Sequence, residues 1–311
     1  MRLVAVISLL AAVSLGCASG TKDEATSHAG GDGRGDGDPA DADTDTDTDA
    51  DADADTDTTD PVDSDGDGLS DDDEADRGTD PDDTDSDDDG IGDGEEVDLG
   101  SDPTAADTDG DTYLDGWEVT EGHDPTDADD RIYEGYWPYN PDKDAMSDPG
   151  WRGTASTGDQ LPRFAWVDQY GDTVDIYDFA FKGKPVVVDL SGVWCYYCNE
   201  VAAFLDGQAS IWDEYREYRS IPGLVNDGDI YWVTVLDSDA SAGAISNRDL
   251  SDWYDAYPNP NIPVLGDEEY ALQGWMDVVG YPSIMLLNED LIVAVYDPDN
   301  YGVVFDALLD L

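Results

Sequence analysis

The pattern of hydrophobic and polar positions changes several times along this chain. Residues 3–15 form a short apolar run. Residues 18–62 are of low complexity, with Gly-Asp first and then Asp-Thr and Asp-Ala repeats, and they present no apolar face. Residues 63–130 place a single apolar residue in each of several acidic loops. From residue 158 onward, runs of β-branched residues alternate with segments of helical spacing, which is typical of an α/β domain. The pattern therefore predicts an ordinary hydrophobic core in the C-terminal part of the chain.

The C-terminal pattern also predicts individual strands and helices. The expected elements are a hairpin over 164–168 and 173–176, a buried strand over 186–190, a helix over about 196–218, a strand over 230–236, a helix over 250–257, a hairpin over 283–287 and 291–295, and a terminal helix over 304–311. Gly207 is expected to kink the long helix, and Pro258 to end the short one.

Charge separates the same regions of the chain. The 311 residues carry a net charge of −64, and residues 1–130 hold 45 of the 77 acidic residues but 4 of the 13 basic ones. All nine Trp residues lie from Trp117 onward. Such acidity argues against nucleic acids and anionic membrane surfaces as partners, and it favours cations.

The apolar run at the N-terminus predicts an export signal. It is too short to span a bilayer comfortably, as in a secretory signal peptide over residues 1–17. Its end, Leu15-Gly16-Cys17, resembles the lipobox of bacterial lipoproteins, in which the Cys is lipidated, although Ser14 stands where Leu is usual. The resemblance implies a protein that acyl chains at Cys17 hold to a bacterial membrane without spanning it. An ordinary signal peptide with a spare Cys is the alternative.

The low-complexity segment over residues 18–62 follows the predicted signal peptide. Like charges repel one another and keep such a segment extended. We therefore expect a disordered tether between the membrane and the folded part of the chain.

A 22-residue repeat follows, with copies that begin at Asp63, Asp85 and Asp107 and lead to a Gly-x-Asp-Pro segment. Acidic residues stand at loop positions 1, 3, 5, 9 and 12, and a tight turn is expected at position 6. Oxygen ligands at this spacing suit Ca²⁺, whereas zinc and copper prefer other ligands and Mg²⁺ keeps more water. The predicted calcium ligands are Asp63, Asp65, Asp67, Asp71 and Glu74 in the first copy, Asp85, Asp87, Asp89, Asp93 and Glu96 in the second, and Asp107, Asp109, Asp111, Asp115 and Glu118 in the third.

These copies resemble bacterial thrombospondin type-3 repeats over about residues 63–126. The third copy departs from the pattern at Thr112, where Gly is expected, so its site is predicted to be weaker. The apolar residue at position 7, which is Leu69, Ile91 or Tyr113, can bury against a neighbouring copy. Calcium would be part of the folded repeats, because the carboxylates repel one another without it. A disordered acidic run is the alternative.

The connector over residues 131–157 is rich in aromatic residues, Pro and Gly. Its Tyr and Trp side chains are Tyr133, Tyr136, Trp137, Tyr139 and Trp151. Such side chains can form a strip that binds sugar, but more often they cap an adjacent domain, and we expect the capping role here.

A pair of cysteines follows the predicted central strand. Cys195 and Cys198 come after a short Ser-Gly turn, where a helix is expected to begin. A helix N-terminus favours a thiolate at Cys195, and Cys198 lies about one turn further on, within reach of a disulfide. The spacing predicts a reversible dithiol. Half a zinc site would need more ligands than His28 and His123, which lie in other segments, and a permanent disulfide within one turn would restrain little chain.

The element order and several motifs resemble the thioredoxin fold, in its TlpA/ResA-like redoxin branch, over about residues 158–311. The matching motifs are Leu161-Pro162-Arg163-Phe164, Gly183-Lys184-Pro185, Trp194-Cys195-Tyr196-Tyr197-Cys198, Ile262-Pro263-Val264-Leu265 and Val278-Val279-Gly280-Tyr281-Pro282-Ser283. The resemblance implies an α/β fold with a central mixed sheet flanked by helices, and a redox site that needs no cofactor. It also implies that Pro282 faces the cysteines and shapes a groove for substrate, and that Asp189 is a buried acid that accepts a proton.

Two positions depart from the pattern of the family or of its neighbours. Tyr196 and Tyr197 replace the usual Pro-containing dipeptide between the cysteines, so the redox direction stays open. A peroxiredoxin would want Thr or Ser three residues before its reactive Cys, and Gly192 stands there, which argues against peroxidase activity.

Taken together, the sequence predicts an exported, lipid-anchored thiol–disulfide oxidoreductase on a calcium-stabilised stalk. Cys195 would be the nucleophile, and Cys198 would resolve the mixed disulfide. Its expected partners are exported proteins with cysteines or disulfides and an upstream redox partner, in a cell envelope, facing the periplasm or the surface. The alternative is a surface calcium-binding or adhesion protein in which the thioredoxin-like domain is a passive module.

Overall fold

The computed structural model describes residues 61–311 of the chain. The predicted signal peptide, the proposed lipidation site Cys17 and nearly all of the predicted tether lie outside these residues. Within the described range, no helix is both long enough and apolar enough to cross a membrane.

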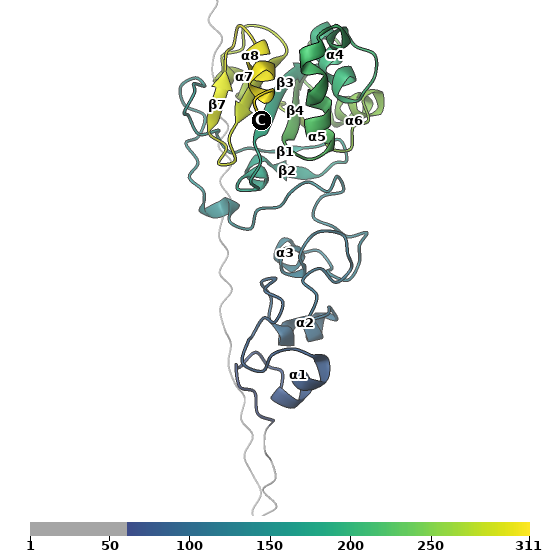
Figure 1. The fold of residues 1–311 in the computed structure, drawn as a ribbon, viewed down its shortest axis with the longest axis vertical. Helices are drawn as coiled ribbons and strands as arrows, with labels where there is room; N and C mark the ends of the chain where they lie inside the picture. Colours follow the sequence, from purple (N-terminus) through teal and green to yellow (C-terminus); the bar gives the residue numbers. More distant parts are fainter. Residues whose placement is uncertain (1–60) are drawn as a thin grey trace, which may run out of the picture. The chain divides into compact units, whose positions relative to one another are not determined.

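Each acidic repeat folds as a loop followed by a short helix (Figure 1). The helices are α1 (Asp71–Arg77), α2 (Asp93–Leu99) and α3 (Asp115–Glu121). Each helix ends at a Gly in the left-handed conformation, namely Gly78, Gly100 or Gly122. Glycine adopts this conformation without strain, so the Gly of each Gly-x-Asp-Pro segment is a helix stop. The 22-residue period is therefore the repetition of loop, helix and cap.

The C-terminal domain is built on a five-stranded sheet in the order β5-β4-β3-β6-β7. The strands are β3 (Val186–Gly192), β4 (Tyr231–Ser238), β5 (Val264–Gly266), β6 (Ser283–Leu287) and β7 (Val293–Tyr296). β3, β4 and β5 are parallel, whereas β6 and β7 pair antiparallel. Every residue of the central strand β3 is buried, as its apolar run predicts. A separate antiparallel hairpin, β1 (Ala165–Val167) and β2 (Thr173–Asp175), precedes the sheet.

Helices cover both faces of this sheet. They are α4 (Tyr196–Leu205), α5 (Ile221–Asn226), α6 (Asn247–Ala256), α7 (Ala271–Met276) and α8 (Gly302–Leu308), with 3₁₀ turns η1 (Lys143–Ala145), η2 (Ile176–Phe179), η3 (Ile211–Glu214) and η4 (Arg216–Ser220). Buried side chains of α4, α5 and α8 pack together on one face, while those of the β1–β2 hairpin, η2 and α7 pack on the other. This is the predicted thioredoxin-like arrangement, in which β3 leads directly into α4 (Figure 1).

The predicted helix over 196–218 is wrong beyond its first half. α4 ends at Leu205, and Gly207 has a φ of 75°, in the left-handed region, where a helix cannot continue. Ser210 then caps a separate 3₁₀ turn, η3. The helical spacing persists in the sequence because Trp212 of this turn still packs in the same hydrophobic cluster as α4.

The connector packs against the domain rather than forming a free strip. Tyr133, Trp137 and Tyr139 are each 5% exposed or less, which confirms the capping interpretation for these three, whereas Tyr136 and Trp151 are 54% and 41% exposed. The Tyr133 hydroxyl donates to Asp178 at 2.6 Å, and the Trp137 indole donates to Asp168 at 2.7 Å. The same hydrophobic cluster includes Tyr113 of the third acidic loop, so this loop and the sheet share one core.

Candidate functional site

The two predicted redox cysteines meet at the start of α4. Cys195 is the N-cap residue of this helix, and it forms a disulfide with Cys198, with a Cα–Cα distance of 5.3 Å. Cys195 is 4% exposed and Cys198 is fully buried. The outer sulfur is therefore that of the N-cap residue, which is the order of accessibility that a nucleophile and a resolving thiol require.

The surroundings of Cys195 favour a negative charge on its sulfur after reduction. The backbone N–H of Cys198 donates to Cys195 Sγ at 3.1 Å, and a hydrogen bond of this kind stabilises an anion more than a neutral thiol. The positive end of the ten-residue helix α4 acts in the same direction. Asn199 holds the turn in place, because its Nδ2 group donates to the carbonyls of Val193 and Cys195.

Exposed aromatic side chains adjoin the cysteines in the sequence, and an exposed Val lies in the segment before Pro282. Trp194, Tyr196, Tyr197 and Val279 are between 48% and 70% exposed. Pro282 is buried, and its peptide bond with Tyr281 is cis. Tyr281, the residue before Pro282, packs against the cluster that contains both cysteines, and its ring meets that of Trp194 edge to face.

Asp189 lies inside the sheet and is 2% exposed. Burial raises the pKa of its carboxyl group from 3.8 to about 7, although a hydrogen bond from Ser191 Oγ at 2.8 Å opposes the shift. No hydrogen bond joins Asp189 to either cysteine in the described part of the chain. The residue thus has a suitable pKa for accepting a thiol proton near neutral pH, but it must do so by rearrangement or through water.

Replacing this carboxyl group is expected to change both stability and rate. Because the folded-state pKa is raised, the contribution of Asp189 to stability is full below pH 4 and is lost as the pH rises through 7. Asp189→Asn should therefore gain stability over wild type above pH 7. It should also slow disulfide reduction about tenfold and flatten the pH–rate profile near 7.

Denaturant unfolding at pH 5 and pH 8 and insulin-reduction rates between pH 5.5 and 8.5 measure these effects. Ser191→Ala is the control, because it removes the hydrogen bond and keeps the carboxyl group. An unchanged rate profile in Asp189→Asn would contradict the proton-acceptor role.

The acidic loops gather carboxylates as their spacing predicts. Oxygens of positions 1, 3 and 5 lie within 4.8 Å of one another in each loop, in the sets Asp63, Asp65 and Asp67, Asp85, Asp87 and Asp89, and Asp107, Asp109 and Asp111. The Glu at position 12 is fully buried in all three copies, as Glu74, Glu96 and Glu118. Each loop thus gathers three Asp carboxylates, and a buried Glu from the following helix lies close to them.

Several of these oxygens are buried without a hydrogen-bond partner among the described residues. They belong to Asp65 and Glu74, to Asp87 and Glu96, and to Asp109, Asp111 and Glu118. Burial, followed by repulsion from neighbouring aspartates, raises the pKa of Glu74 to about 7 and those of Glu96 and Glu118 to about 8. Such carboxylates need a counter-charge, and the all-oxygen set fits a cation such as Ca²⁺.

The aspartates at position 9 have a different environment. Both oxygens of Asp71 accept from Ser64, those of Asp93 from Ser86, and those of Asp115 from Thr108, at 2.6–2.9 Å. In each copy the carboxylate therefore ties the start of the helix to position 2 of the loop. These contacts give position 9 a loop-closing role that its spacing in the sequence did not reveal.

Successive repeats are joined at a glycine in position 10. The Gly94 N–H donates to Asp67 at 2.8 Å, and the Gly116 N–H donates to Asp89 at 2.9 Å. A Cβ on Gly94 or Gly116 would lie 2.5 or 2.7 Å from a backbone oxygen of the preceding loop, so no larger residue fits. The first of the three copies carries Asp72 at this position.

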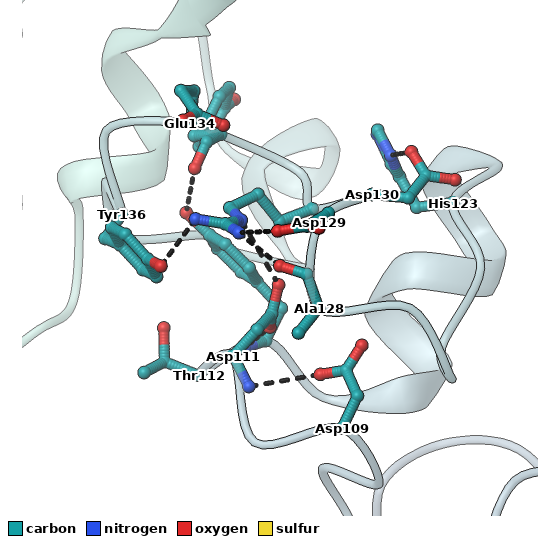
Figure 2. Close-up of polar contacts among 12 residues, drawn as sticks. Asp109, Asp111, Thr112, His123, Ala128, Asp129, Asp130, Glu134 and Tyr136 are labelled. Atoms are coloured by element: carbon teal, nitrogen blue, oxygen red, sulfur yellow. Dashed lines mark hydrogen bonds and ion pairs between the residues drawn. The ribbon is translucent and has the colours of Figure 1, made fainter.

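Arg131 takes the place of a further repeat after the third loop. Its Nε lies 3.9 Å from Asp111, the residue that corresponds to Asp67 and Asp89, while its NH2 group donates to the Ala128 carbonyl. Figure 2 shows Asp111 of the third loop, whose backbone N–H donates to Asp109, below Asp129 of the following segment. The end of the stack is therefore closed by a cation of the chain itself.

Sequence patterns missed three parts of these sites. Arg131 and Asn199 have no signature, because their roles depend on backbone groups that come near only in the fold. Asp237 is separated by 44 residues from Tyr281, whose hydroxyl donates to its carboxylate. Only the change from Asp to Gly at position 10 was available as a signal for the stacking of repeats.

Comparison with known proteins identifies the acidic segment. Residues 63–83, 85–106 and 107–128 match the family model described as Bacterial TSP3 repeat. This match confirms the predicted repeats and their period.

A longer match is to a protein of Haemophilus influenzae that carries the description "Uncharacterized protein". It is 30% identical over 122 residues, which are 39% of this chain and 69% of that protein. The chain belongs to the family of this protein. The description of that protein states no activity.

Solved structures similar to this chain include three bacterial proteins. The thioredoxin domain of a thiol–disulfide oxidoreductase from Bacteroides vulgatus is 20% identical, with 50% of this chain and 99% of that chain covered and a TM-score of 0.35. A thiol:disulfide interchange protein from Bacteroides sp. is 18% identical, with 50% of this chain and 90% of that chain covered and a TM-score of 0.37. An exposed lipoprotein thioredoxin from Streptococcus pneumoniae is 24% identical, with 48% of this chain and 99% of that chain covered and a TM-score of 0.35.

Proposed function

We propose that the chain is a thiol–disulfide oxidoreductase that acts on protein disulfides. The observation that carries the proposal is the Cys195–Cys198 pair, closed at the N-terminus of α4, in which Cys195 Sγ accepts the N–H of Cys198. A ring this small restrains almost no chain, so stabilisation is a poor reason for its presence. A dithiol that opens and closes is the chemistry that this geometry supports.

The proposed reaction begins with the reduced pair. The Cys195 thiolate attacks one sulfur of the substrate disulfide, forms a mixed disulfide and displaces the other substrate sulfur as a thiolate, which takes up a proton. Cys198 then loses its proton to Asp189 and attacks Cys195 Sγ, which releases the second substrate thiol. The substrate gains two electrons, and the chain is left with the Cys195–Cys198 disulfide. A dithiol donor must reduce this disulfide before the next turnover.

The direction we favour is reduction or isomerisation of substrate. The residues around the pair supply the Cys195 thiolate with a helix N-terminus and one N–H, and among the described residues no Lys or Arg side chain donates a hydrogen bond to its sulfur. We expect a modest lowering of the Cys195 pKa, whereas strongly oxidising pairs have very acidic thiols.

Insulin reduction by the mature full-length chain tests the activity. With dithiothreitol as electron donor, wild type should accelerate precipitation of the insulin B chain, and Cys195→Ser should fall to the uncatalysed rate. Equal rates for the two proteins would leave the passive-module function as the better account.

We also propose that the repeats bind Ca²⁺, through positions 1, 3, 5 and 12 of each loop. Unpartnered buried oxygens lie at positions 3 and 12 of every copy and at position 5 of the third, and the oxygens of positions 1, 3 and 5 cluster in each loop. The position 9 carboxylates, by contrast, are occupied by Ser or Thr. The metal would neutralise the carboxylates of the loop and hold in place the helix that carries the position 12 Glu. The third loop keeps the required turn with Thr112 at a φ of 93°, which is strained for a residue with a side chain, so its site should be the weaker one.

Export and lipid anchoring at Cys17 complete the proposed function, with the Leu15-Gly16-Cys17 sequence as their support. Cys17→Ala should move the mature protein from the membrane fraction to the soluble one, or leave an uncleaved precursor. Partition of the wild type into detergent, followed by mass measurement of its N-terminal peptide, provides the check. A mature N-terminus without acyl chains would refute the anchor.

A further inference from the structure

Asp237 lies at the C-terminal end of β4, and its carboxylate is fully buried. None of the ion pairs in the described range includes it. A buried carboxylate without a counter-ion is costly unless hydrogen bonds satisfy it. Here Oδ1 accepts from Ser238 Oγ at 2.7 Å, and Oδ2 accepts from Gln273 Nε2 at 3.1 Å and from the Tyr281 hydroxyl.

One arm of this network reaches the residue just before the reactive cysteine. Ser238 Oγ donates to Asp237 and accepts from the indole Nε1 of Trp194 at 2.9 Å. A Cβ on Gly192 would lie 2.7 Å from Ser238 Oγ and 2.8 Å from Trp194 Nε1, so the contact needs glycine there. The Trp194 ring is held at its polar edge while about half of the residue stays exposed.

The other arm reaches the residue just before Pro282. The Tyr281 hydroxyl donates to Asp237, and burial together with this hydrogen bond raises the pKa of Tyr281 above its usual range. The hydroxyl therefore stays protonated and remains a donor. The rings of Trp194 and Tyr281 meet edge to face, with centroids 5.6 Å apart. Both arms thus converge on two aromatic rings beside the cysteine pair.

We propose that Asp237 is a positioning residue of the redox site, which fixes Trp194 and Tyr281 as two walls against which a substrate polypeptide docks. This inference rests on the proposed function and adds the residue that arranges its substrate site. Asp237 makes no hydrogen bond to either cysteine in the described chain, so it acts through the two aromatic residues. Protein disulfides need both walls, whereas a small disulfide reaches Cys195 without them.

The test compares a protein and a small disulfide as substrates. Asp237→Asn keeps the size of the side chain but replaces one carboxylate oxygen with an NH2 group. This NH2 group would face side chains that donate to Asp237 in the wild type. We expect kcat/KM for insulin to fall about tenfold, mainly through KM, which corresponds to about 1.4 kcal/mol. The rate with glutathione disulfide should stay within twofold of wild type. Asp178→Asn is the matched control, a fully buried carboxylate that contacts the connector, and it should lower stability without changing KM.

The position of Trp194 is followed independently of activity. The indole N–H resonance of Trp194, assigned with Trp194→Phe, should shift and exchange faster with solvent in Asp237→Asn. Inactive wild type would defeat the proposed function, while this resonance would still decide whether Asp237 holds the ring. If Asp237→Asn does not fold, Ser238→Ala and Tyr281→Phe cut one arm each and should each raise KM for insulin about threefold.

Two results would overturn the positioning role. One is an unchanged KM for insulin in Asp237→Asn. The other is an equal loss of rate with insulin and glutathione disulfide together with an unaltered Trp194 resonance, which would indicate a general structural defect.

Discussion

Cys198→Ser is expected to accumulate mixed disulfides with other proteins, whereas Cys195→Ser should accumulate few. In Cys198→Ser the N-cap thiol still attacks a substrate disulfide, but no second thiol releases the adduct. In Cys195→Ser the remaining thiol belongs to a fully buried residue inside the first turn of α4. The difference in adduct yield should be at least about tenfold, because attack depends on both access and thiolate fraction.

Non-reducing electrophoresis of the exported fraction measures this difference, and dithiothreitol should reduce the mixed disulfides and release the trapped proteins. The double variant Cys195→Ser/Cys198→Ser is the control, because it retains Cys17 and so reveals any adduct formed there. Equal trapping by the two single variants would contradict the assignment of nucleophile and resolving thiol. Absence of trapping in all of them, with inactive wild type, would favour the passive module.

Removal of Ca²⁺ is expected to unfold the three repeats in the full-length chain. Without a cation, each loop holds buried carboxylate oxygens that have no partner, and their mutual repulsion opposes the fold. Ligand at 100 times its dissociation constant contributes about 2.7 kcal/mol per site, so filling the sites should raise the stability of the repeats by several kcal/mol. Calcium titration of the chelated protein, followed by circular dichroism and thermal melting, measures this gain.

Variants within the loops sharpen the calcium test. Asp85→Ala should cost more calcium affinity than Asp107→Ala, because the third loop is already strained at Thr112. Asp98→Ala removes one exposed charge from α2 without touching a loop and is the matched control. A titration without any calcium-dependent change would rule out the metal-stabilised repeats.

The pH dependence of calcium binding has a defined direction. Glu96 and Glu118 have pKa values raised to about 8 in the metal-free fold, with burial as the main cause and neighbouring aspartates as the next. A proton on either Glu competes with the cation, so the apparent calcium affinity should fall as the pH drops from 8.5 to 6. The stability of the metal-free repeats should instead rise as the pH drops, because the raised pKa values of their Glu side chains make the protonated fold the more stable one.

Loss of calcium should also weaken the thioredoxin-like domain. The N–H of Tyr113 donates to Asp111 at 2.9 Å, and its hydroxyl donates to the Trp137 carbonyl at 2.7 Å, within the core shared with the sheet. A change in the third loop therefore reaches a packed side chain of the domain. The melting temperature of the domain in the full-length chain reports this coupling.

The sequence alone determined the features that depend on neighbours in the chain. The spacing of Cys195 and Cys198, the 22-residue period of the acidic loops and the apolar run of β3 each specify local geometry, and the structure has all three. The thioredoxin-like order of strands followed from the same local patterns together with a family resemblance. Such signals survive in a single sequence because the residues that make them lie within one loop or one strand.

Only the tertiary structure decided what happens between distant segments. α4 stops at Leu205 although the apolar spacing continues, because Gly207 turns the chain while Trp212 still reaches the same cluster. Hydrogen bonds across 27 residues join Asp67 to Gly94 and Asp89 to Gly116. The network of Asp237, Trp194 and Tyr281 forms where β4 ends beside the segments that precede Cys195 and Pro282. Contacts of this kind depend on which strands pair, and the spacing of residues along the chain does not record that.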